Sequence, residues 1–160
     1  MGYYDIALIC KNGHVINDSF KEYPELNTKF CKECGSITIY SCQKCNTPIR
    51  GDYNMPGIAF LGGGMETAPA YCHECGNAYP WTEEKLKAIQ EVMSLGNLTK
   101  EDKDDFDKNL NDIVSETPRT KVAALKIKMI GQKVTNEIWE VAKGIIVEIA
   151  SETAKKTIGL

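Results

Sequence analysis

The chain has 160 residues, of which 26% are charged, and its formal net charge is −3 at pH 7. This length suits one medium domain or two small ones, and neither half is basic, which argues against binding duplex nucleic acid by neutralising phosphates. The chain contains no uncharged run of roughly 18 residues that would span a membrane, and Asp5 and Lys11 interrupt the apolar stretch at the N-terminus, so we expect neither a membrane span nor a signal peptide.

The first half of the chain predicts short strands. Residues 3–9 form the first, residues 15–17 return from it, and residues 36–40 alternate β-branched and aromatic side chains. Residues 46–71 contain three prolines and several glycines, which predicts a long loop. These segments offer too few apolar residues for an independent core, so we expect metal to stabilise this half.

All seven cysteines lie before residue 76, and with one histidine they form four close pairs: Cys10 and His14, Cys31 and Cys34, Cys42 and Cys45, Cys72 and Cys75. Three pairs are Cys-x-x-Cys, and Gly35 and Gly76 follow two of them, where a tight turn favours positive φ. An odd number of cysteines does not suit a closed disulfide framework, whereas eight ligands make two tetrahedral sets. The sequence therefore predicts two structural zinc ions per chain.

The fourth ligand of the first set has an alternative. Gly13 allows the chain to fold back toward the metal, which favours His14 as a ligand. Alternatively, His14 lies on the surface, and water or Asp18 completes the site. A hard carboxylate is the less usual partner of three thiolates, so we favour His14.

Two pairings of the ligand pairs are possible. The segments 30–35 and 71–76 match closely, and each follows a more divergent pair, which favours two sequential ribbons. In the other arrangement, a cross-brace, the first and third pairs share one metal, and the second and fourth share the other.

The second half predicts helices. Thr82 is the expected N-cap of a helix over 83–94 that ends at Gly96, and Thr99 is the expected N-cap of an acidic helix that reaches about residue 115. The buried stripe of the acidic helix is expected to contain Phe106, Leu110, Ile113 and Val114.

Residues 120–157 carry apolar residues at helical spacing. As one helix, this segment would be roughly 57 Å long. Either Gly131 splits it into a hairpin, or its apolar face packs against another copy of the chain. We expect self-association through this stripe, or a protein partner held by it, with contacts from Ile127, Val134, Ile138, Val141, Ile145 and Ile149.

A basic stretch overlaps the start of this segment and contains no acid: Arg119, Lys121, Lys126, Lys128 and Lys133. It could bind nucleic-acid phosphate or anionic lipid. The more usual role of such a run is a solvated helix face, here matched to the acidic helix that precedes it. The aromatic residues Tyr3, Tyr4, Tyr40, Tyr71, Tyr79 and Trp81 could likewise stack on bases, although covering a small metal core is their more usual role.

Several segments resemble a bacterial family of uncharacterised zinc-ribbon proteins, and the similarity covers most of the chain: residues 10–17, 30–35, 47–51 and 71–83, the joint at 115–119 and the tail at 151–156. The resemblance implies a bacterial cytosolic protein with paired zinc ligands. It implies no particular activity.

Together these features predict an α+β protein with a double zinc ribbon at residues 1–81 and a helical domain at 82–160. We expect a cytoplasmic, non-enzymatic interaction or adaptor protein, because reduced cysteines are held by zinc and both ligand sets are full. A nucleic-acid- or ribosome-associated factor is the alternative, and a zinc hydrolase ranks third. No small-molecule substrate is expected.

Overall fold

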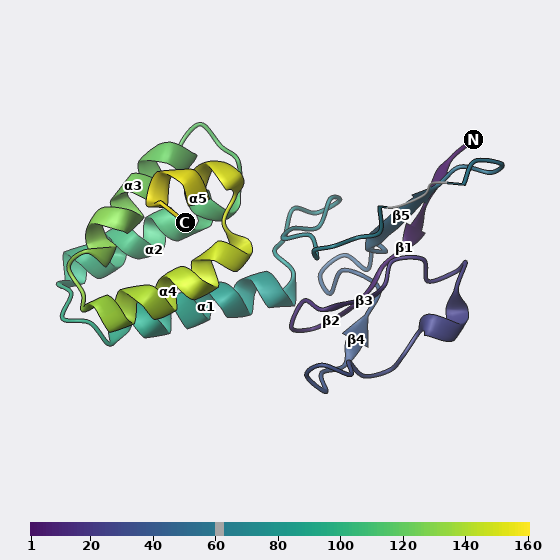
Figure 1. Ribbon diagram of the computed structural model, residues 1–160, viewed down its shortest axis with the longest axis horizontal. Coiled ribbons are helices and arrows are strands. Elements are labelled where there is room, and N and C mark those ends of the chain that lie inside the picture. The colour runs from purple at the N-terminus through teal and green to yellow at the C-terminus, as the bar shows by residue number, and fades with distance from the viewer. Residues whose placement is uncertain (60–62) are drawn as a thin grey trace. The chain divides into compact units, whose positions relative to one another are not determined.

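The computed structural model describes residues 1–59 and 63–160, and within them the chain divides into two compact units. The first unit, Met1–Glu83, contains the strands, and the second, Glu84–Leu160, is built of helices (Figure 1). The α+β class is therefore confirmed, with small antiparallel sheets followed by helices.

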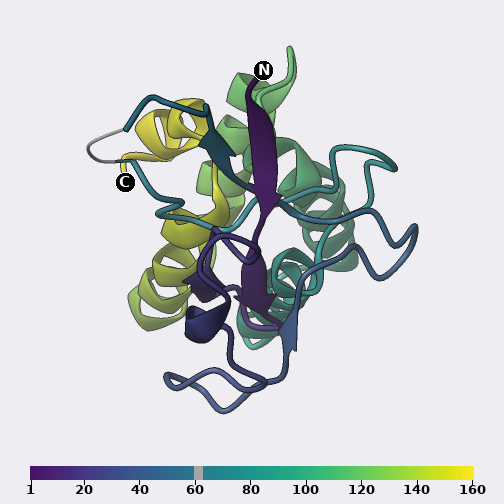
Figure 2. The same ribbon diagram turned by 90° about the vertical axis from the view of Figure 1, so that its right-hand side faces the viewer.

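One sheet of the first unit joins the N-terminus to a distant segment. β1 (Tyr3–Ile6) pairs antiparallel with β5 (Arg50–Asn54), and Tyr4 lies opposite Tyr53. Figure 2 shows these strands side by side near the N-terminus. The prediction of a loop over 46–71 is thus wrong at β5, where pairing with β1 orders residues of low strand propensity. Residues 60–62 of the predicted loop lie outside the described residues.

The other sheet has three strands in the order β3-β2-β4. β2 (Leu8–Cys10) pairs with β3 (Val15–Asn17) on one side and with β4 (Thr38–Ile39) on the other, and a short 3₁₀ helix, η1 (Pro24–Leu26), follows β3 in the chain. The single strand predicted over residues 3–9 is therefore two strands in two sheets. Ala7 lies between them, and its amide donates to the carbonyl of Ile49 at 2.8 Å.

The core of the first unit is small. Ala7, Ile9 and Ile49 are buried together with Tyr79 and Trp81, whose rings stack at a centroid distance of 4.7 Å. The indole Nε1 of Trp81 donates to the carbonyl of Pro69 at 2.8 Å, so the side chain's polar atom is also satisfied. Of the aromatic residues in this half, these two pack in the core, whereas Tyr3, Tyr4 and Tyr40 are exposed.

Thr82 has a different role from the predicted N-cap. α1 (Pro80–Ser94) begins two residues earlier, and the Thr82 hydroxyl donates to the carbonyl of Ala70 at 2.9 Å. Thr82 is buried, so this hydroxyl satisfies a carbonyl of the preceding loop. The prediction failed because tertiary packing, which a local cap pattern does not contain, placed the helix start at Pro80, a residue favoured in the first turn.

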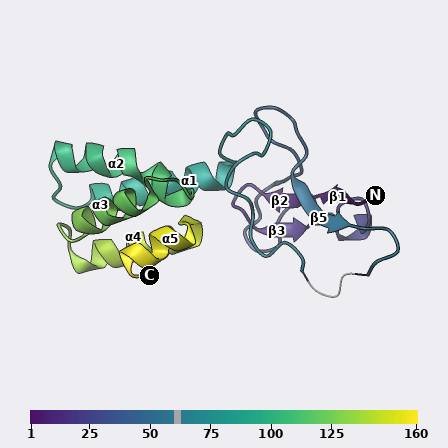
Figure 3. The ribbon, with the colours of Figure 1, turned by 90° about the horizontal axis from the view of Figure 1, so that it is seen from above.

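The second unit packs its helices around one apolar core. α2 (Lys100–Val114) has Thr99 as its N-cap, as predicted, since the Thr99 hydroxyl accepts from the amide of Asp102 at 3.1 Å. α3 (Thr120–Gly131) packs against α2 on one side and against α5 (Glu152–Ile158) on the other (Figure 3). α4 (Asn136–Ile149) is linked to α1 by the ion pair Lys85–Glu148 at 2.9 Å.

The segment from 120 to 157 is three helices, which resolves the alternative left open by the sequence. A Cβ on Gly131 would lie 2.5 Å from the ring of Trp139, so only glycine allows α4 to fold back this closely on the end of α3. Thr135 then caps α4, and Ser151 caps α5. The continuous 57 Å helix is therefore ruled out.

This reversal buries most of the predicted self-association stripe within the unit. Ile127 is fully buried, and Val134, Ile138, Ile145 and Ile149 are partly buried and packed against the same core. Val141 is exposed. The fold therefore covers most of this stripe without a second copy, because α3 and α4 belong to one core rather than to one long helix. Self-association or a protein partner at these residues stays a prediction.

Among the described residues, no helix is long and apolar enough to cross a membrane.

Candidate metal centres

The three Cys-x-x-Cys segments adopt the same turn. In each, the amide of the first cysteine donates to a carbonyl five residues later, at 2.9 Å for Cys31 and 2.8 Å for Cys42 and Cys72. The carbonyl of that cysteine accepts from the amide of the residue after the second cysteine, at 2.8 Å for Cys31 and 2.9 Å for Cys42 and Cys72. That following residue has positive φ in every case, at Gly35, Asn46 and Gly76. Asn46 was not foreseen, although asparagine is one of the few residues that adopt this conformation readily.

The pair Cys10 and His14 is held differently, by the hairpin of β2 and β3. The Cys10 amide donates to the His14 carbonyl at 3.0 Å, and the Gly13 amide donates to the Cys10 carbonyl at 2.8 Å. Gly13 has φ of 91°, and a Cβ there would approach the side chain of Trp81 to 3.0 Å. The hairpin turn therefore requires glycine, and it brings the His14 ring back over Cys10.

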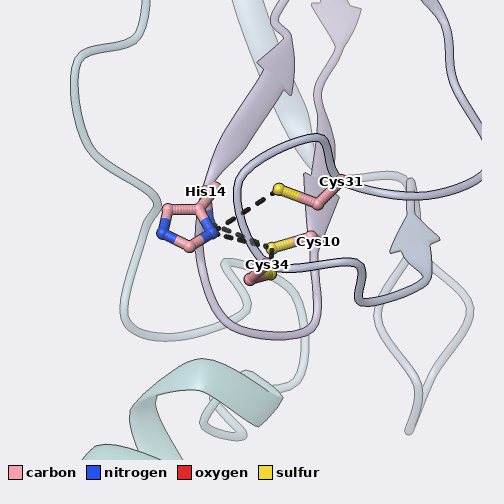
Figure 4. Close-up of side chains that lie close together, drawn as sticks. All are labelled: Cys10, His14, Cys31 and Cys34. Atoms are coloured by element: carbon pink, nitrogen blue, oxygen red, sulfur yellow. Dashed lines mark hydrogen bonds between the residues drawn. The ribbon is translucent and has the colours of Figure 1, made fainter.

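These turns bring Cys10, His14, Cys31 and Cys34 together in the first site (Figure 4). The Nδ1 atom of His14 lies 3.4 Å from Sγ of Cys10 and 3.6 Å from Sγ of Cys31. Sγ of Cys10 lies 3.7 Å from Sγ of Cys34. Figure 4 shows the histidine ring with Nδ1 toward the sulfur atoms and Nε2 away from them.

Cys42, Cys45, Cys72 and Cys75 form the second site. Two sulfur pairs, Cys42 with Cys75 and Cys45 with Cys72, are each separated by 3.7 Å. In both sites the four ligand atoms lie within 4.8 Å of one another. The ligand pairs are thus grouped in sequential order, and the cross-brace is not what the structure contains.

The distances fit a tetrahedral metal ion. Metal–sulfur bonds of about 2.3 Å and metal–nitrogen bonds of about 2.0 Å imply separations of about 3.8 Å between two sulfurs and about 3.5 Å between sulfur and nitrogen. The measured separations are 3.7 Å and 3.4–3.6 Å. Both sites could therefore each hold one metal ion through four protein ligands.

An asparagine side chain donates to one sulfur in each site. Nδ2 of Asn12 lies 3.3 Å from Sγ of Cys34, and Nδ2 of Asn77 lies 3.3 Å from Sγ of Cys75. A donor facing a thiolate stabilises its charge, and such outer ligands tune metal affinity. Sequence reasoning missed both asparagines. A visible pattern was available for Asn77, because a polar residue stands two positions after each Cys-x-x-Cys: Ser36, Thr47 and Asn77.

The thiols differ in acidity for physical reasons. The backbone amide of Ser36, followed by Asn12, lowers the pKa of Cys34 to about 6, and the Asn77 side chain, followed by its backbone amide, lowers the pKa of Cys75 to about 6. Burial raises the pKa of Cys10 and of Cys42. Each site thus combines an exposed, readily ionised thiol with a buried one.

Asp18, the carboxylate alternative to His14, lies outside the ligand sets. The Asp18 carboxylate accepts from the amide of Met65 at 2.7 Å and from the hydroxyl of Ser19 at 3.1 Å. It therefore ties β3 to the segment after residue 62. His73 is exposed within its turn.

The predicted basic stretch divides into two groups. Arg119, Lys126 and Lys133 form ion pairs with acids of α2, at 3.1 Å to Asp112, 3.1 Å to Asp105 and 2.7 Å to Asp102. The Lys133 ammonium is the largest cause of the lowered pKa of Asp102. Lys121 and Lys128 have no ion pair with any residue that the structure describes. The match to the preceding acidic helix thus holds for three of the five residues.

Comparison with protein families identifies a match over nearly the whole chain. No curated protein and no solved structure is similar to this chain. A family model described as "Uncharacterized protein conserved in bacteria (DUF2321)" matches residues 3–158, which include both ligand sets and all five helices. The chain therefore belongs to this bacterial family, DUF2321.

Proposed function

We propose that this protein is a non-enzymatic interaction protein whose N-terminal unit is held together by two structural zinc ions. The observation that carries the proposal is the pair of complete ligand sets, each with four protein atoms at tetrahedral separations. Thiolate and imidazole ligands in this geometry suit zinc, with iron as the main competitor.

Closed ligand sets favour a structural over a catalytic metal. A catalytic zinc ion keeps one position open for water or substrate, whereas each set here supplies all four ligands. The small apolar core of the first unit agrees with a structural role, since folding then depends on the metal. Thiolate ligands that must stay reduced also favour the cytoplasm as the location.

Interaction is the activity that such a unit can supply, because it presents a surface held rigid by its metal ions. The nucleic-acid alternative receives less support. Three of the five basic residues proposed for it are paired with acids of α2, so the face as a whole offers little net charge to phosphate.

The metal content tests the proposal. Native mass spectrometry of protein purified without chelators should show two zinc ions per chain, and Cys75→Ser should show one, since the second site loses a ligand. His73→Ser is the matched control, because this exposed residue lies in the same turn outside the ligand set. Iron in place of zinc, or a loaded site in Cys75→Ser, would contradict the proposal.

Two double variants test the sequential grouping independently. Cys42→Ser with Cys75→Ser damages only the second site, so one zinc ion should remain. Cys10→Ser with Cys42→Ser damages both sites, so none should remain. A cross-brace would give the opposite pair of results.

A further inference from the structure

α3 has two apolar faces, and only one of them is used by the fold. Ala123, Ala124, Ile127 and Ile130 are buried in the core of the second unit. On the opposite side, Val122, Leu125 and Met129 are 51%, 51% and 58% exposed. We name these three residues the α3 seam. Amphipathic helices normally have a polar outer face, so a second apolar stripe indicates a surface with another use.

The spacing of the α3 seam is that of a coiled coil. Residues 122, 125 and 129 are separated by three and then four positions, which places them at a, d and a of a seven-residue repeat. Valine at a and leucine at d are typical of two-stranded pairing. The next d position is Pro118 on the N-terminal side and Gln132 on the C-terminal side. The apolar stripe therefore runs only from Val122 to Met129, about 10.5 Å or two helical turns.

The positions that flank a coiled-coil seam determine which partner it accepts. In this repeat, Lys121 and Lys128 occupy the two g positions and Lys126 an e position. Arg119 and Lys133 continue the e register just outside the two ends of α3. The e residues are those paired with Asp112, Asp105 and Asp102 of α2. One flank is thus neutralised within the fold. The other carries Lys121, which is exposed, and Lys128, which is half-buried with its Nζ 4.0 Å from where a Cβ of Gly159 would lie; neither has an ion pair among the described residues.

We propose that the α3 seam binds an acidic amphipathic helix of a protein partner. The seam would receive the partner's apolar stripe, and Lys121 and Lys128 would pair with carboxylates about one heptad apart on the partner. This proposal rests on the proposed function, since it names the surface and the partner of an interaction protein.

The surroundings of the seam favour a narrow helix over other occupants. A flat anionic bilayer or a nucleic acid would also meet the acidic α2 beside it, which has six acids and three lysines over Lys100–Val114. In a second copy paired antiparallel through α3, the g lysines would face one another and repel. A single acidic helix lying along the seam meets Lys121 and Lys128 on one flank and basic residues already paired with α2 on the other.

Binding of a designed peptide to the zinc-loaded full-length protein tests the proposal. The probe is a fluorescein-labelled peptide of about three heptads with Ile at a, Leu at d and Glu at e and g; the comparison peptide has Lys at e and g. Fluorescence anisotropy should show that the acidic peptide binds at least about tenfold more tightly than the basic one.

Three variants should separate the seam from general charge. Leu125→Glu should weaken binding of the acidic peptide at least about tenfold, and Lys121→Glu with Lys128→Glu should reverse the preference between the peptides. Lys100→Glu with Lys108→Glu is the matched control, an equal charge change on α2 that should retain the preference. Leu125 is exposed, so circular dichroism of its variant should match the parent.

Several results would overturn the proposal. One is equal affinity of the parent for the two peptides. Another is an α2 control variant that loses the preference for the acidic peptide as fully as the Lys121→Glu, Lys128→Glu variant. Sedimentation of a parent dimer that Leu125→Glu dissociates would assign the seam to a second copy. Binding to phosphatidylglycerol vesicles without binding of the acidic peptide would assign it to a membrane surface. The zinc content is measured separately. A content other than two zinc ions per chain would reject the proposed function without affecting the peptide result.

Discussion

The asparagines beside the exposed thiols are placed to influence how strongly protons would compete with a metal ion at each site. Asn77 donates to Cys75, and Asn12 donates to Cys34, and each donor is among the causes of a thiol pKa of about 6. A thiol must lose its proton to bind the metal, so any change that raises its pKa makes protons better competitors.

The first prediction follows from this contact. Asn77→Ala should raise the pKa of Cys75 above about 6, toward the ordinary thiol value of 9.0. Proton competition then persists to higher pH, so the second site should release zinc at a higher pH than in the parent. Zinc affinity at pH 7 should fall by about tenfold. Competition with a chromophoric chelator across a pH series measures both effects.

Asn12→Ala is the matched variant, and it should weaken the first site while sparing the second. Equal zinc retention by Asn77→Ala and the parent at every pH would show that the amide has no influence on the thiolate.

At the level of single residues, the sequence was informative where metal coordination determines the spacing between ligand residues. The eight ligand residues could be grouped from their intervals and from the repeat around Cys31 and Cys72. Asn77 shares its polar position with Ser36 and Thr47, which was the one available signal. Asn12 had none, because an asparagine that donates to sulfur looks like any polar turn residue until the turn geometry is known. Asn46 shows the same limit, since its positive φ depends on the turn it completes.

Among the elements, the reversal after α3 depends on contact between a glycine and an aromatic ring. Gly131 closes α3 directly against Trp139 of α4, while Gly144, in the middle of α4, has open space where a Cβ would be. These two helical glycines therefore have opposite consequences for stability.

The second prediction uses this contrast. Gly131→Ala should lower the free energy of unfolding by about 1–3 kcal/mol, because the methyl group must displace the Trp139 ring. Gly144→Ala should raise it by about 0.5–1 kcal/mol, because alanine is the better helix residue and meets no neighbour. Urea unfolding of the zinc-loaded proteins measures both. Destabilisation by both substitutions, or by neither, would contradict the assigned roles.

Helices were predicted better than strands, for a physical reason. The apolar spacing and Thr99 located α2 because these features are local. β5 escaped notice because its sequence, Arg-Gly-Asp-Tyr-Asn, has no apolar alternation, and its strand depends on β1, more than 40 residues away. The length of the helix after residue 120 was also undecidable, since the close packing of Gly131 against Trp139 is a tertiary feature.

For the whole molecule, the two units differ in what stabilises them. The first has a small core beside two clusters that could each hold a metal ion, and the second has a continuous apolar core to which α1 to α5 all contribute. Removal of metal should therefore affect the units unequally.

The third prediction uses the two tryptophans as reporters, since Trp81 belongs to the first unit and Trp139 to the second. In Trp139→Phe, chelation of zinc should shift the emission of Trp81 to longer wavelength, because its buried ring becomes exposed. In Trp81→Phe, the emission of Trp139 should stay unchanged, and the helical circular dichroism should persist in both. If chelation also shifted the emission of Trp139 and removed the helical circular dichroism, the two units would unfold together.

The pairing of β1 with β5 also sets an order of events while the chain is being made. The ligands of the first site span residues 10–34, so that site can close as soon as this short stretch has left the ribosome. β1 comes before it, yet its partner strand ends at Asn54, after Cys42 and Cys45. The N-terminal strand, with exposed Tyr3 and Tyr4, therefore stays unpaired beside the β2–β3 hairpin until both Cys42 and Cys45 have been synthesised. Metal binding at the first site would hold the nascent chain in a shape that β5, the last of these strands to be synthesised, can complete.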